Sequence, residues 1–133
     1  MADFTGKYKQ VSSNNFDALM KELGASDEVA AALKNQMQDL EFSKNGNVFT
    51  QKSISPQRTQ EIQFELGKEF DEKRHDGRTV KSVVVLDGNK FVKTTVDKEK
   101  GKELKVVSEF NGNELKVTAT SGAVVATGVY TKQ

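Results

Sequence analysis

The chain has 133 residues, with 20 Lys and Arg against 19 Asp and Glu, for a formal net charge of +1. This is the length of one domain, and the charge lacks the basic surplus typical of nucleic-acid binders. Cysteine is absent and His75 is the single histidine, which excludes disulfides, thiolate zinc sites and a cysteine nucleophile. We therefore expect one globular domain over residues 1–133, with no metal, no cofactor and no nucleic-acid partner.

Two short amphipathic helices are expected near the N-terminus, after a first strand. Apolar side chains recur there at helical spacing in two sets, which are Phe16, Leu19, Met20 and Leu23, and then Val29, Leu33 and Met37. Gly24 ends the first helix and Ser26 can cap the second. Each helix has about two to three turns and is marginal alone. We therefore expect a helical lid over about residues 15–36 that docks on the rest of the domain.

Glycine-containing turns divide the remaining sequence into short segments. The turn pairs are Asn45-Gly46, Asp76-Gly77, Asp87-Gly88, Lys100-Gly101, Asn111-Gly112 and Ser121-Gly122. Asn-Gly and Asp-Gly favour hairpins with type I′ turns, whose two central residues both need positive φ. The segments between the turns are rich in Val, Thr and Phe, which predicts strands over 80–86, 91–96, 104–110, 115–120 and 124–130.

The predicted order is one strand, two helices and about nine further strands joined mostly by hairpins. Hairpin-linked strands form an up-and-down antiparallel meander, and closure into a barrel removes its exposed edges. A barrel of about eight or more strands is wide enough to hold a ligand. The pattern therefore predicts an all-β barrel, with two helices inserted between its first two strands as a lid.

Several blocks of residues resemble a known family. They are GKY at 6–8, NFDALM at 15–20, FELGKEFDE at 64–72, DGRTVKS at 76–82, and EFNG at 109–112 followed by Tyr130. In order and spacing they resemble the intracellular lipid-binding proteins of the calycin superfamily, which bind fatty acids, retinoids or bile acids. The resemblance covers essentially the whole chain. It implies a ten-stranded barrel, a helix–turn–helix lid and an internal cavity for one or two hydrophobic ligands.

The chain departs from that family at the headgroup site. Members that bind fatty acids or retinoic acid place two arginines in the barrel near a terminal tyrosine, and here those positions are Ser108 and Gly128, leaving Tyr130. Burial of methylenes at about 0.8 kcal/mol each still offers roughly 10 kcal/mol to a sixteen-carbon chain. We expect long-chain fatty acids to bind with weakened carboxylate selectivity. The alternative ligand is a bulkier amphiphile, such as a retinoid or a bile-acid-like or sterol-like molecule.

The candidate ligand-binding residues come from strand alternation, from the lid and from the resemblance. They are Tyr130, Arg78, Ser108, Gly128, Phe16, Met20, Val106, Val117, Ala119 and Arg58. The small inward residues Ser108, Ala119, Ala126 and Gly128 either enlarge the cavity near its closed end or are filled in by neighbouring side chains.

Two arginines are candidates for a replacement cation. The resemblance matches Arg78 to an inward position, although we favour the simpler explanation that Arg78 pairs with Asp76 and stabilises the bend. Arg58 lies near the presumed portal, where the alternative is ordinary surface charge.

Catalysis is not expected, because the one His–carboxylate neighbourhood, His75-Asp76, lies at a turn and no Gly-rich phosphate loop opens a helix. The start of the sequence lacks the apolar core of a signal peptide. Residues 15–35 hold two cations and four anions, unlike a lid that docks on anionic membranes. We expect a cytoplasmic monomer that carries a hydrophobic small molecule and makes at most transient membrane contact.

Overall fold

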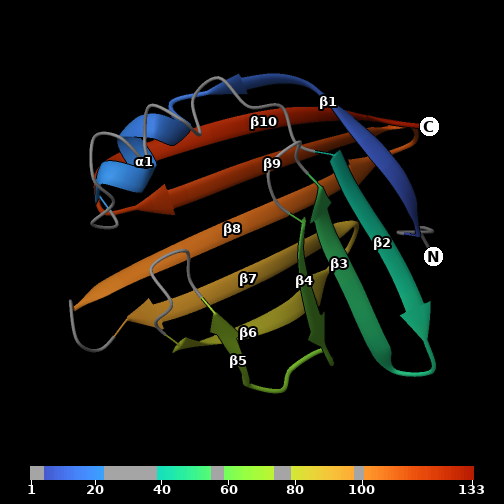
Figure 1. Ribbon diagram of the computed structural model, residues 1–133, viewed down its shortest axis with the longest axis horizontal. Coiled ribbons are helices and arrows are strands. Elements are labelled where there is room, and N and C mark those ends of the chain that lie inside the picture. Colours follow the sequence, from blue (N-terminus) through green and yellow to red (C-terminus); the bar gives the residue numbers. More distant parts are fainter. Residues whose placement is uncertain (1–4, 23–38, 55–58, 74–78, 98–100) are drawn as a thin grey trace.

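The computed structural model describes residues 5–22, 39–54, 59–73, 79–97 and 101–133. In these ranges the chain forms an antiparallel β-structure with a short helix after the first strand (Figure 1). The elements are β1 (Gly6–Asn14), α1 (Phe16–Glu22), β2 (Asp39–Asn45), β3 (Val48–Ile54), β4 (Thr59–Phe64), β5 (Phe70–Lys73), β6 (Thr79–Asp87), β7 (Lys90–Asp97), β8 (Lys102–Asn111), β9 (Glu114–Ser121) and β10 (Val124–Lys132). The predicted strand segments are confirmed, with ends that differ by one or two residues.

The strands form one ten-stranded sheet in the order β4-β3-β2-β1-β10-β9-β8-β7-β6-β5. Antiparallel pairing of β1 with β10 joins the first and last strands, so the sheet curls into a nearly closed barrel (Figure 1). The sheet ends at β4 and β5, and there the rings of Phe64 and Phe70 stack with centroids 5.9 Å apart. Beside them the Gly67 amide donates a 2.8 Å hydrogen bond to the Val84 carbonyl. The all-β, ten-stranded up-and-down fold is confirmed.

The hairpins use a different turn from the expected one. In the β8–β9 hairpin Asn111 pairs with Glu114, so the two loop residues are Gly112 and Asn113. Gly112 has a φ of 60°, whereas Asn15 is the one described non-glycine residue with positive φ. Glycine at the first loop position with positive φ is typical of a type II′ turn. The prediction of type I′ turns with Asn or Asp as a central residue was therefore wrong, because that residue instead ends the strand.

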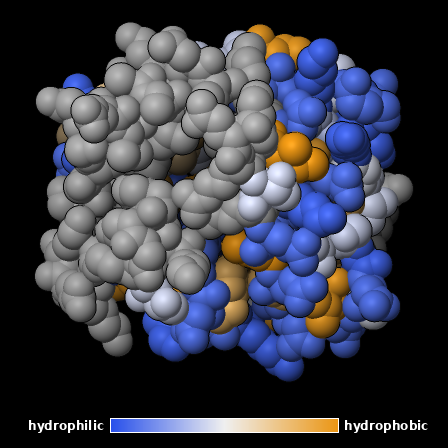
Figure 2. All heavy atoms as spheres, in the orientation of Figure 1, coloured by the Kyte–Doolittle hydropathy of each residue, from blue (hydrophilic) through white to orange (hydrophobic). Residues whose placement is uncertain are grey.

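An aromatic cluster fills one part of the barrel interior. Its rings belong to Tyr8, Phe42, Phe49, Phe64, Phe91 and Phe110, all buried. Most neighbouring rings meet edge to face, as aromatic pairs prefer; the Phe42 and Phe110 centroids, for example, lie 5.4 Å apart at 82°. The described surface in Figure 2 is mainly hydrophilic with scattered hydrophobic side chains, as expected when alternate strand residues face outward.

Helix α1 packs on β9 and β10, where the wall residues are small. Leu19 is buried against Ala119 and Ala126. Asn15 precedes the helix with a φ of 71°, and its side-chain amide donates a 2.9 Å hydrogen bond to the Val125 carbonyl. The first expected helix is thus confirmed over Phe16–Glu22. The expected second helix lies outside the described residues, so the two-helix lid stays a prediction. In the described part of the chain, no helix has the length and apolar content needed to cross a membrane.

Substitution Phe110→Ala tests the contribution of the aromatic cluster to stability. Phe110 is buried and its ring contacts Tyr8, Phe42 and Phe91. We expect the free energy of unfolding in urea to fall by about 3–5 kcal/mol, because the change removes apolar burial and leaves a cavity. The exposed Val125 is the control, and Val125→Ala should cost less than about 1 kcal/mol. Equal losses for the two variants would contradict the assignment of the cluster as the core.

Candidate functional site

A cavity of about 140 Å³ lies inside the barrel, between the aromatic cluster and helix α1. The described residues that line it are Phe16, Leu40, Gln51, Ser53, Phe64, Val84, Phe91, Lys93, Val106, Ser108, Val117 and Tyr130. Most of these side chains are apolar and a few are polar, a composition typical of small-molecule sites. The larger space of about 290 Å³ near Lys44 and Leu66 opens at the surface and lacks this enclosure.

The structure brings part of the predicted set of site residues together. Phe16, Val106, Ser108, Val117 and Tyr130 lie on the cavity wall. They come from α1, β8, β9 and β10, and alternation on the three strands turns them inward. Their contact with a ligand stays a prediction.

The other predicted residues lie elsewhere or outside the described part. Ala119 is not among the described residues that line this cavity; it is buried in a cluster with Leu19, against which the wall residues Phe16 and Val106 pack. Arg58 and Arg78 fall outside the described residues, as does the side chain of Met20. Neither arginine is therefore placed as a replacement cation.

Gly128 shows what fills the space beside a small wall residue. A Cβ built on Gly128 would lie 3.3 Å from Cε1 of Tyr130, 3.4 Å from Cε2 of Phe16 and 3.6 Å from Nε2 of Gln10. These side chains already occupy that volume. At Gly128, Ala119 and Ala126 this packing favours the alternative in which neighbouring side chains fill the space, and an enlarged closed end in the presence of a ligand stays a prediction.

Tyr130 supplies a phenol to the cavity wall. Burial, with a smaller contribution from the Asp39 carboxylate, raises the pKa of Tyr130 to about 12. The phenol therefore keeps its proton at neutral pH. A protonated phenol at this position can donate a hydrogen bond to an anionic or polar headgroup.

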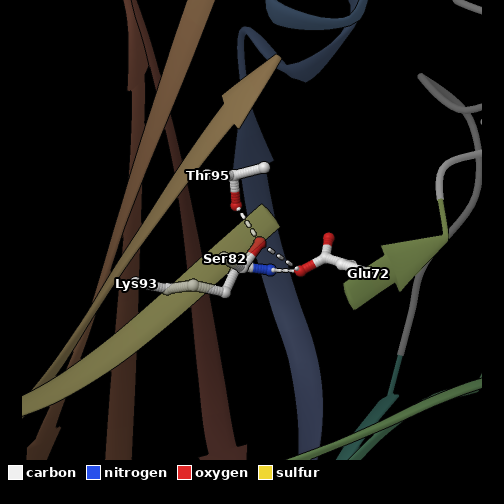
Figure 3. A network of polar contacts seen from close by, with 4 residues as sticks. All are labelled: Glu72, Ser82, Lys93 and Thr95. Atoms are coloured by element: carbon white, nitrogen blue, oxygen red, sulfur yellow. Dashed lines mark hydrogen bonds and ion pairs between the residues drawn. The ribbon is translucent and has the colours of Figure 1, made fainter. Parts of the chain in front are cut away.

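Lys93 is a cavity residue that the sequence prediction missed. Its Nζ lies 2.7 Å from Oε1 of Glu72, and both side chains are only 16% exposed (Figure 3). The Ser82 hydroxyl donates to the same Glu72 oxygen at 3.3 Å and lies 2.7 Å from the Thr95 hydroxyl. The available signal was strand alternation, which places Lys93 on the same face of β7 as the buried Phe91 and Thr95.

A nearly closed barrel around an apolar cavity with a few polar wall groups is a ligand-binding β-barrel. The chain belongs to the lipocalin / cytosolic fatty-acid binding protein family, whose model matches residues 5–133. This is a family of binding proteins rather than enzymes, in agreement with the expectation from the sequence.

Similar proteins from several animals span the same length. A fatty acid-binding protein of Lepidoglyphus destructor is 42% identical over 131 residues, which cover 98% of each chain. The crystal structure of a fatty acid-binding protein from brain tissue of Drosophila melanogaster is 39% identical with a TM-score of 0.91, covering 97% of this chain and 99% of that one. The fatty acid binding protein of Schistosoma mansoni, solved in complex with arachidonic acid, is 35% identical with a TM-score of 0.92, covering 100% of this chain and 98% of that one.

The raised pKa of Tyr130 predicts a pH dependence of stability. The folded-state pKa is about 12 and the ordinary value is 10.0, so the unfolded chain loses this proton first as pH rises. The stabilising contribution is complete below pH ~10 and is lost between about pH 10 and pH 12, amounting to about 3 kcal/mol. Tyr130→Phe removes the titrating group. Urea unfolding of both proteins across this range should show the wild type losing stability relative to the variant, and parallel pH profiles would contradict the prediction.

Proposed function

We propose that this protein binds a long-chain fatty acid inside the barrel and carries it through the cytoplasm as a monomer. The observation that carries the proposal is the mainly apolar cavity inside the barrel, between the aromatic cluster and α1. Membership of the family and the arachidonic acid complex of the schistosome relative support the same ligand class. In this proposal the protein makes at most transient contact with membranes.

Apolar burial is sufficient to hold such a ligand. A sixteen-carbon chain gains roughly 10 kcal/mol at about 0.8 kcal/mol per methylene. Association and ordering cost about 4 kcal/mol or more, which leaves about 6 kcal/mol, an affinity of roughly tens of micromolar before any headgroup contact is added. The binding energy therefore comes chiefly from the chain, and the polar wall groups decide which headgroup is preferred.

The space that the described wall residues surround is smaller than a typical ligand site. About 140 Å³ is small beside the roughly 300–1,000 Å³ of sites for drug-sized ligands. Phe16 is the half-buried wall residue carried by α1, whereas the other described wall residues lie on strands whose backbone is held by the sheet ladders. We therefore infer that the ligand displaces the Phe16 ring as it enters.

A bulkier amphiphile is the second candidate, as a retinoid or a bile-acid-like or sterol-like molecule. Ser108 on the cavity wall favours it, because a serine leaves more room than a long side chain. Gly128 and Ala119 do not favour a bulkier ligand, because protein atoms fill the space beside them. Competition between ligand classes therefore discriminates the two candidates.

Displacement of a fluorescent fatty-acid analogue tests the proposed ligand class. We expect oleate to displace the probe at concentrations of roughly tens of micromolar or below, and retinol and cholate to require higher concentrations. Displacement by cholate or retinol at lower concentrations than oleate would favour the bulkier ligand instead. No binding of the probe or of any of the three ligands would overturn the proposed function.

A pair of variants on β9 locates the binding site. Val117 lies on the cavity wall, while its neighbour Lys116 is exposed on the opposite face of the strand. We expect Val117→Gln to weaken oleate binding by at least about tenfold, because it brings an amide into an apolar cavity. Lys116→Gln should leave the affinity unchanged. Equal affinities for the two variants would place the ligand outside this cavity.

A further inference from the structure

The ion pair between Lys93 and Glu72 belongs to the cavity wall. Lys93 pairs across the sheet with Val84 on one side and Val106 on the other, and both of these valines line the cavity. Lys93 is also the one charged side chain among the described residues that line it. Lysine is rarely buried unless it is paired, because removing its charge from water is costly. Its inward position in an apolar cavity therefore needs an explanation, either structural or in ligand binding.

Sheet register places Lys93 beside Ser108. Lys93 lies opposite Val106 and Phe91 lies opposite Ser108, so Lys93 and Ser108 are diagonal neighbours on adjacent strands. Such neighbours are about 7–8 Å apart, within reach of a lysine side chain. In the structure the Lys93 ammonium extends to the other side, across β6 to Glu72 on β5.

The contacts around Glu72 keep the lysine partly available. Glu72 accepts hydrogen bonds at Oε1 from both Lys93 and Ser82, and Ser82 is linked in turn to Thr95. This network, drawn in Figure 3, holds the glutamate against β6 and β7. An ammonium has three N–H donors, and Glu72 takes one of them. A ligand carboxylate can therefore bind the same ammonium while Glu72 stays in place.

We propose that Lys93 recognises the carboxylate of the bound fatty acid and that Glu72 limits the strength of this recognition. The inference rests on the proposed function and adds the residue that selects the headgroup. A hydrogen bond between ammonium and carboxylate is charge-assisted and strong in a weakly solvated site. Glu72 shares the ammonium and repels a second carboxylate, so it lowers the affinity for the acid without affecting a neutral ester.

The test is the ratio of the dissociation constants for methyl oleate and oleate, measured by displacement of the fluorescent analogue at pH 7.4. We expect the wild type to prefer oleate. Glu72→Gln should strengthen oleate binding by about tenfold and leave methyl oleate unchanged, because it removes the competing charge. The double variant Lys93→Met/Glu72→Gln should bind both ligands equally. It removes both charges together, so no unpaired charge is left buried.

A second pair on β7 and β8 supplies the matched control. Lys90 and Glu109 form a cross-strand ion pair with Nζ and Oε2 3.6 Å apart, and their side chains are 42% and 32% exposed. Lys90→Met/Glu109→Gln should leave the ratio at the wild-type value. Circular dichroism checks the fold of every variant. If the double variant at the cavity fails to fold, the ratio measured for Glu72→Gln alone tests the proposal.

The outcomes separate the two proposals. Binding of both ligands by the wild type with equal affinity would overturn the role of Lys93 and leave the proposed function standing. An unchanged ratio in the Glu72 and Lys93 variants would show that the pair is purely structural. Failure of the wild type to bind either ligand would overturn the proposed function, and the role of Lys93 with it.

Discussion

The ladder between β1 and β10 is the interaction on which the rest of the structure depends. It joins the two ends of the meander, with Tyr8 opposite Lys132 and Asn14 opposite Thr127, and it contains an irregularity between Gln10 and Ser12. The backbone N–H of Gln133 extends the contact by donating a 2.8 Å hydrogen bond to the Lys7 carbonyl. Without this pairing two further strand edges would be exposed, and water would reach the interior from that side. Enclosure of the cavity is therefore a consequence of chain topology, and no single wall residue determines it.

The interior of such a wide barrel divides according to side-chain size. Aromatic rings fill one region, small residues on β9 and β10 admit Leu19 of α1 in another, and the cavity remains between them. Phe64 belongs both to the aromatic cluster and to the cavity wall, so the packing that stabilises the fold also shapes the site. The Lys93–Glu72 pair places two opposite charges beside this mainly apolar interior. A buried ion pair is weak evidence for stability because desolvation offsets much of its attraction, which makes a part in ligand selection the stronger explanation.

Most of the fold could be predicted from the sequence, since strand alternation and glycine turns act locally. The turn type was missed because a dipeptide such as Asn111-Gly112 does not show whether asparagine ends the strand or enters the loop. For the site, alternation turned Val106, Ser108, Val117 and Tyr130 inward, but it could not show that Phe16 and Tyr130 fill the space beside Gly128. Lys93 was missed for two physical reasons. Val92 and Val96 make the other face of β7 equally apolar, and the partner Glu72 is distant in sequence, so the pair arises only from the tertiary fold.

A crystal structure of the protein with oleate tests the central claim most directly, because it locates the acyl chain. The account predicts density for the chain inside the barrel, between Phe64 or Phe91 and helix α1, with the Phe16 ring displaced from its present position. Oleate bound on the outer surface, with the interior still closed around the same side chains, would contradict it.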